Sequence, residues 1–178
     1  ECWINLSQAL IDLGKFERAF QAVSRALQID PTLPAAHNQL AEVYRKSSKF
    51  DLAISAYKKS LELDPRQYES MLGLATVYRE SEDSDAALTI LSRLIKLEPR
   101  HAKAYTALGV LKEQIGDTAG AADCFKKSIE LAPDVISPHY HLSQIKSRKS
   151  SEGEILAMER FQKMTGLSRE DRAHLHFS

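Results

Sequence analysis

The sequence predicts an all-α protein, folded as a right-handed α-solenoid of antiparallel helix pairs. The first observation is a period of 34 residues, which places prolines at Pro31, Pro65, Pro99 and Pro133. The second is that apolar and small residues recur within each period at spacings of three and four, as they do on one face of an α-helix. The third is that one such unit cannot bury its apolar face alone, so neighbouring units must stack.

Four full periods occupy residues 1–33, 34–67, 68–101 and 102–135. The first half of each predicts a helix in which leucine is followed by a small residue, at Leu6-Ser7, Leu40-Ala41, Leu74-Ala75 and Leu108-Gly109. Three residues before each leucine stands a further residue expected on the packing face: Trp3, His37, Met71 and Tyr105. The small residues allow the two helices of a pair to approach closely.

The second half of each period predicts a second helix with three packing columns. Alanine begins the pattern, a bulky residue follows four positions later, and a third column completes the face: Ala19, Val23 and Ala26; Ala53, Tyr57 and Ser60; Ala87, Leu91 and Leu94; Ala121, Phe125 and Ser128. Interruptions of the apolar period mark the turns, at Gly14-Lys15, Ser48-Lys49, Asp83-Ser84 and Gly116-Asp117. The lattice prolines end each second helix or lie just beyond it.

A fifth, degenerate unit is expected over residues 136–167. Its first helix keeps the register, but its second helix fits only if the turn is two residues longer, which places Ala157, Phe161 and Met164 on the packing columns. Ser168 resembles a helix N-cap, so residues 168–178 are expected to begin a further helix. Both ends of the chain fall inside repeats, and we expect them to associate end to end with neighbouring molecules at high concentration.

Composition excludes several classes of protein. The chain has 178 residues with 24 basic and 24 acidic side chains, and this neutrality argues against a nucleic-acid partner, which needs an excess of Lys and Arg. No stretch approaches the ~18 apolar residues of a membrane span. Cys2 and Cys124 are too few for a disulfide framework, so a reducing, cytoplasmic location is the expectation.

The columns of Trp or its substitutes, Leu, small residue, Ala, bulky residue and Pro over 34 residues resemble the tetratricopeptide repeat family. The resemblance covers residues 1 to about 135 without insertion or deletion. It implies a superhelix whose first helices line a concave groove, and a function in binding a protein or peptide partner.

No catalytic constellation, metal site or cofactor-binding motif is expected in this segment. His139 and His141 stand two residues apart, as do His174 and His176, so the side chains of each pair diverge on a helix and cannot share a metal. One packed and one exposed histidine is the simpler interpretation of each pair. Cys124 is expected to be a small buried hydrophobe. The aromatic residues fit packing columns better than a base-stacking platform.

Side chains beside the packing stripe of the first helices are the candidate partner contacts, and the alternative is that they form a merely solvated face. Asn and Gln among them can hydrogen-bond the main chain of an extended peptide in both directions. The candidates are Asn5, Gln8, Asn38, Gln39, Glu42, Lys46, Glu69, Leu72, Thr76, Arg79, Lys103, Thr106, Val110, Glu113, Tyr140 and His141.

Capture of chaperone C-terminal tails is disfavoured. Family members that grip these acidic tails use Lys, Arg and Asn at fixed columns, where this sequence carries uncharged and acidic residues such as Gln8, Gln39 and Glu69. Loss of the cations removes the groups that would bind carboxylate.

Two functions remain open. One is an interaction scaffold that binds a partner in the groove. The other is the non-catalytic N-terminal region of a larger bacterial enzyme, since residues 138–142 and 167–177 resemble the passage from tetratricopeptide repeats into a sulfotransferase domain. Any sulfate-donor site would then lie in another part of the protein, so this segment is not itself expected to be an enzyme.

Overall fold

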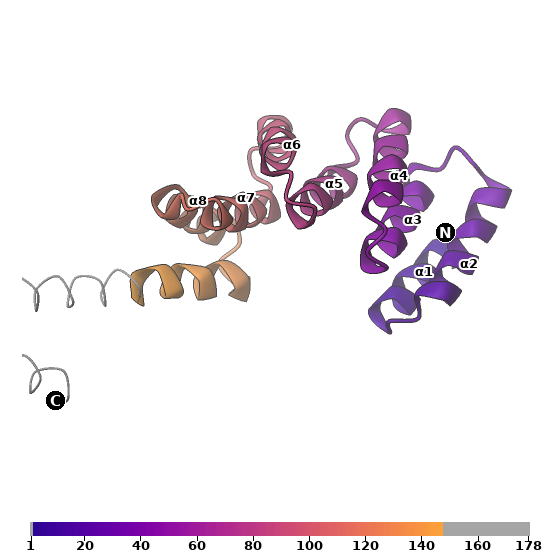
Figure 1. The fold of residues 1–178 in the computed structure, drawn as a ribbon, viewed down its shortest axis with the longest axis horizontal. Helices are drawn as coiled ribbons and strands as arrows, with labels where there is room; N and C mark the ends of the chain where they lie inside the picture. The colour runs from indigo at the N-terminus through magenta and orange to yellow at the C-terminus, as the bar shows by residue number, and fades with distance from the viewer. Residues whose placement is uncertain (1, 148–178) are drawn as a thin grey trace, which may run out of the picture.

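The computed structural model describes residues 2–147, which form helices joined by short turns (Figure 1). The helices pair in chain order: α1 (Cys2–Asp12) with α2 (Phe16–Ile29), α3 (Pro34–Lys46) with α4 (Phe50–Leu63), α5 (Tyr68–Glu80) with α6 (Ser84–Leu97), and α7 (Ala102–Gln114) with α8 (Thr118–Leu131). Residues 136–147 are also helical. The predicted all-α solenoid of helix pairs is confirmed.

The turn within each pair contains a residue in the left-handed backbone region, at Gly14, Ser48, Glu82 and Gly116. Glycine adopts this conformation without the steric cost that a Cβ atom brings. The sequence predicts the third turn at Asp83-Ser84, whereas the left-handed residue is Glu82, with a φ of 65°. Asp83 is instead the N-cap of α6 and accepts a hydrogen bond from the Ala86 amide.

The second helices end where the sequence predicts. They stop two residues before the lattice prolines, at Ile29, Leu63, Leu97 and Leu131. Acidic side chains close the turn that follows: Asp30 accepts from the Thr32 amide at 2.9 Å and Asp64 from the Arg66 amide at 2.9 Å. The Asp-Pro pairs therefore both end the helix and shape the path to the next one.

The core follows the predicted columns of the second helices. Ala19, Ala53, Ala87 and Ala121 are fully buried, and the bulky residues four positions later are buried with them. Hydroxyls at the third column are also buried and are satisfied across helices: Ser60 donates to the Pro34 carbonyl and Ser128 to the Ala102 carbonyl, each at 2.9 Å. Polar residues at these two positions therefore connect the second helix to the first turn of its partner.

The packing face of the first helices differs from the prediction in two ways. The sequence predicts Trp3 and Leu6 on the packing face, but they are 42% and 45% exposed, whereas Leu74 in the same register as Leu6 is 2% exposed. In α5 this position packs against the preceding pair, and no helix pair in the described residues precedes α1. The sequence pattern also does not include a buried column at the start of later first helices: Ala36, Ser70, Ala104 and Pro138.

The first helices lie on the inner side of the curve. Helix α3 contacts α1, α5 contacts α3, and α7 contacts α5, whereas no comparable contacts join the successive second helices of the described chain. A stack in which one helix row is closer together than the other curves toward the closer row. The pairs follow one another from α1 and α2 at one end to α7, α8 and the segment 136–147 at the other (Figure 1). Within residues 2–147, no helix is long and apolar enough to cross a membrane.

Candidate functional site on the concave surface

A depression of about 250 Å³ lies on the inner surface where α1, α3 and α5 meet. Seven of the candidate contact residues line it: Gln8, Asn38, Gln39, Glu42, Glu69, Leu72 and Thr76. Arg45, Tyr57 and Gly73 complete the lining. The structure therefore brings together candidates that stand up to 68 residues apart in the sequence, because the 34-residue period places equivalent positions side by side on successive first helices.

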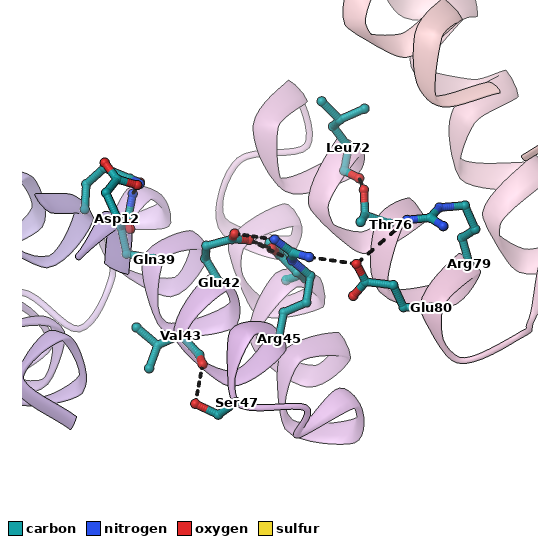
Figure 2. A network of polar contacts seen from close by, with 12 residues as sticks. Asp12, Gln39, Glu42, Val43, Arg45, Ser47, Leu72, Thr76, Arg79 and Glu80 are labelled. Carbon is teal, nitrogen blue, oxygen red and sulfur yellow. Dashed lines mark hydrogen bonds and ion pairs between the residues drawn. The ribbon is translucent and has the colours of Figure 1, made fainter. Parts of the chain in front are cut away.

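An ion-pair network crosses from α3 to α5 beside the depression (Figure 2). Arg45 donates from Nε to Glu42 Oε2 at 3.0 Å and from Nη1 to Glu80 Oε1 at 2.8 Å. Its Nη2 also bonds the second Glu42 oxygen. Arg79 Nη2 lies 3.8 Å from the same Glu80 oxygen. Arg45 thus joins two units, and its planar guanidinium is suited to such two-sided pairing.

Tyr57 reaches the same network from α4. Its hydroxyl donates to Glu42 Oε2 at 2.8 Å, while its side chain is 1% exposed. Burial raises the pKa of the Glu42 carboxyl, but the hydrogen bonds from Arg45 and Tyr57 outweigh burial and hold that pKa below its ordinary value. Burial and the Glu42 charge both raise the pKa of Tyr57. At neutral pH the network therefore contains an ionised Glu42 and a protonated Tyr57.

Glycine at position 73 makes room for the Tyr57 ring beside the depression. A Cβ atom there would overlap the Tyr57 ring, which occupies the space above the α5 backbone. The same register carries Asn5, Gln39, Ala107 and His141 on the other first helices. At position 73 the Tyr57 ring takes the place of a side chain and forms part of the lining of the depression.

Amides form a second polar group at the α1 side of the depression. Gln39 Nε2 donates to Gln8 Oε1 at 3.0 Å, and Gln8 Nε2 donates to Asp12 Oδ1 at 2.9 Å. Asn38 accepts from the Ser70 hydroxyl at 2.9 Å through its Oδ1 atom. This bond orients the Asn38 amide so that its NH₂ group is the end left for another acceptor.

Several predicted contacts beyond the depression pack against neighbouring helices. The Thr106 hydroxyl on α7 lies 2.7 Å from that of Ser128 on α8, within one helix pair. His141 is half-buried, with its ring stacked on Phe125 at 4.9 Å and its Nδ1 atom 3.0 Å from Glu113 Oε2. Val110 is half-buried, and the remaining candidates are exposed: Asn5, Lys46, Lys103 and Tyr140. The structure thus divides the candidates into a central group around the depression, a group that contacts neighbouring helices, and an exposed group.

Sequence reasoning missed Arg45 and the polar role of Tyr57. The candidates Arg79 and Glu113 stand one and two periods after Arg45, so the 34-residue spacing could have identified Arg45 as a candidate too. The sequence assigns Tyr57 to a packing column, and it does pack there. Only its hydroxyl contact to Glu42 is a tertiary feature that the sequence does not show.

The remaining reactive groups do not assemble into a site within residues 2–147. No cluster of three or more His, Cys, Asp or Glu residues there could hold a metal ion. Cys124 is half-buried and not the fully buried residue that the sequence predicts, because it flanks the Phe125 column without occupying it. Burial raises the pKa of its thiol, which disfavours the reactive thiolate. His174, His176 and the columns at Ala157, Phe161 and Met164 lie outside the described residues.

Family models of the tetratricopeptide repeat match most of the described chain. Models described as tetratricopeptide repeat match residues 74–146 and 34–67, and one described as TPR repeat matches residues 8–48. None of these three models describes a sulfotransferase, so the suggested fusion has no support from them. No curated protein matches the chain.

Solved structures similar to this chain share its fold. Pseudomonas aeruginosa PilF is 24% identical with a TM-score of 0.76, over 84% of this chain and 68% of that chain. A thermophilic tetratricopeptide protein of Thermus thermophilus is 20% identical with a TM-score of 0.74, over 80% of this chain and 79% of that chain. The first such domain of Spaghetti (RPAP3), solved with the HSP90 peptide SRMEEVD, is 20% identical with a TM-score of 0.61, over 66% of this chain and 93% of that chain. Identities this low establish a shared fold and no shared ligand.

Proposed function

Because the chain belongs to the tetratricopeptide repeat family, we propose that it is an interaction scaffold that binds an extended segment of a partner protein along the concave surface of α1, α3, α5 and α7. We further propose 1–33, 34–67, 68–101 and 102–135 as its repeat units and 136–167 as a degenerate fifth unit. The chemistry of any larger protein that contains this segment would lie elsewhere.

The depression at the meeting point of α1, α3 and α5 is the observation that carries this proposal. It opens on the inner surface, and residues from three successive units line it. A ligand seated there would contact all three units together, which a merely solvated face of one helix does not allow. Helix pairs of a solenoid are held in register by their neighbours, so the lining is pre-organised.

The amides around the depression suit the main chain of an extended peptide. Asn38 keeps its NH₂ group for a carbonyl, and Gln39 uses only one of its two N–H groups to bond Gln8. Main-chain recognition of this kind provides affinity without requiring one sequence. An acidic chaperone tail fits poorly, because Glu42 and Glu80 already hold Arg45 and keep it from a ligand carboxylate.

A peptide selection tests the proposal. Linear random peptides displayed on phage would be selected on the whole chain, and the affinity of the best peptides would be measured by fluorescence anisotropy. The combined substitutions Asn38→Ala, Gln39→Ala and Thr76→Ala should weaken binding at least tenfold. Lys59→Ala with Glu62→Ala, a pair on the outer helix α4, is the matched control and should leave affinity unchanged. Unchanged affinity in the triple variant would place the binding surface elsewhere.

A further inference from the structure

We propose that the depression between α1, α3 and α5 receives a basic side chain, lysine or arginine, from the bound segment. This inference rests on the proposed function and specifies which partner chemistry the concave surface selects. It combines three features of the depression: an uncompensated carboxylate, an apolar wall, and an amide placed for the main chain.

Charge is the first feature. Glu42 and Glu80 are paired with Arg45, and Arg79 lies beside Glu80, so these four residues balance one another (Figure 2). Glu69 also lines the depression, and its exposed carboxylate has no hydrogen-bond or ion-pair partner among residues 2–147. The lining therefore has one negative charge in excess. A cation from the ligand would complete the pairing and a second anion would be repelled.

The wall of the depression is the second feature. Leu72 lines the depression with an apolar side chain, and the Thr76 hydroxyl donates to the Leu72 carbonyl at 2.8 Å. Figure 2 shows that hydroxyl turned back onto its own helix, so its hydrogen is already engaged and is not offered to a ligand. Lysine and arginine bury a methylene stem against such a surface while the charged end stays with a carboxylate. Leucine would fill the same wall and leave Glu69 unpaired.

An amide placed to bind the main chain of the ligand is the third feature. The Asn38 NH₂ group, oriented by the Ser70 bond, can donate to a peptide carbonyl next to the inserted residue. Ser70 is in turn 2.7 Å from the Ser60 hydroxyl, which links this group to α4. A donor for the main chain and a carboxylate in the same lining define one position in the peptide where charge is selected.

Glu69→Lys and Glu69→Gln variants of the whole chain test this inference in the same phage-display selection. Glu62→Lys is the matched control, because it makes the same charge change at an exposed glutamate on the outer helix α4, which does not line the depression. We expect wild type and Glu62→Lys to enrich Lys or Arg at one position of the selected peptides. We expect Glu69→Lys to replace that preference with Asp or Glu. For a peptide selected on wild type, Glu69→Gln should weaken binding about fivefold and Glu69→Lys at least tenfold, in line with partly exposed and like-charged pairs.

The outcomes separate the two proposals. If peptides bind and the Asn38, Gln39 and Thr76 substitutions weaken them, but no basic position is enriched, the inference about the depression is wrong and the scaffold proposal stands. The inference is also wrong, and the scaffold proposal again stands, if Glu69→Lys leaves the basic preference unchanged. If no peptide is enriched on the wild-type chain, groove binding itself is overturned, and this inference with it.

Discussion

Removing the Tyr57 hydroxyl should destabilise the chain to an extent that depends on the charge of Glu42. The bond is 2.8 Å long and its donor is almost fully buried. Hydrogen bonds to charged groups contribute about 1.5–3 kcal/mol. Glu42 keeps its bonds from Arg45 in a Tyr57→Phe variant, and its side chain is 23% exposed. The free energy of unfolding should therefore fall by about 1–2 kcal/mol, near the lower end of that range. For a chain of this size the midpoint of thermal unfolding should fall by about 2–8 °C.

The pH dependence provides the sharper measurement. The pKa of Glu42 is lowered in the folded chain from an ordinary value of 4.5, so its contribution to stability is present above pH 4.5 and is lost as pH falls through the lowered value. Once Glu42 is protonated, the bond from Tyr57 is one between neutral groups and is weaker. The difference in unfolding midpoint between wild type and Tyr57→Phe should therefore shrink below pH 4.5.

Thermal unfolding followed by circular dichroism between about pH 3 and pH 8 measures both effects. Tyr78→Phe is the control, because Tyr78 is half-buried on α5 and its hydroxyl makes no hydrogen bond within residues 2–147. It should leave the midpoint nearly unchanged at every pH. A Tyr57→Phe deficit that is the same in acid as at neutral pH, or that is absent at neutral pH, would refute the assignment of this bond to an ionised Glu42.

Three further predictions follow from the packing and the helix ends. Gly109→Ala should destabilise by about 1–3 kcal/mol in urea unfolding, because its Cβ would lie 2.6 Å from the buried Phe125 ring; a neutral effect would show that the ring can move. Asp83→Ala removes the N-cap of α6 and should lower the free energy of unfolding by about 1 kcal/mol, and Asp83→Asn should lower it much less. Lys49→Asp adds a cap to α4 at an equivalent backbone position and should raise the free energy of unfolding by about 0.5–1 kcal/mol. Trp3→Ser should reduce self-association in sedimentation velocity at high concentration, and an unchanged profile would exclude the exposed α1 face as the contact.

Most of the helical architecture was predictable because it depends on local and periodic features. The 34-residue spacing of the prolines, the alanine columns and the turn signals each act within one helix or between sequence neighbours. Trp3 shows the limit of such reasoning: its column predicts packing, but burial requires a neighbouring unit to cover it. Glu82 shows a smaller limit, since the sequence located the third turn only to within a residue or two.

The candidate site was predictable as a surface but not as a set of contacts. Register alone placed Gln8, Glu42 and Thr76 near one another, because equivalent positions on successive first helices lie side by side. It could not show that Arg45 also pairs with Glu80, or that Thr106 is turned toward Ser128. Those choices depend on side-chain distances between helices.

The sequence by itself determined a stack of helix pairs, because the period repeats with the spacing of one helix face and each unit needs its neighbour to bury that face. The tertiary structure decided which charges on the inner surface remain unpaired. Glycine at position 73 admits the Tyr57 ring, Tyr57 and Arg45 hold Glu42, and Glu69 is left facing an open depression. The physical reason is that pairing between charges falls off over a few ångströms, a scale that packing sets and residue order does not.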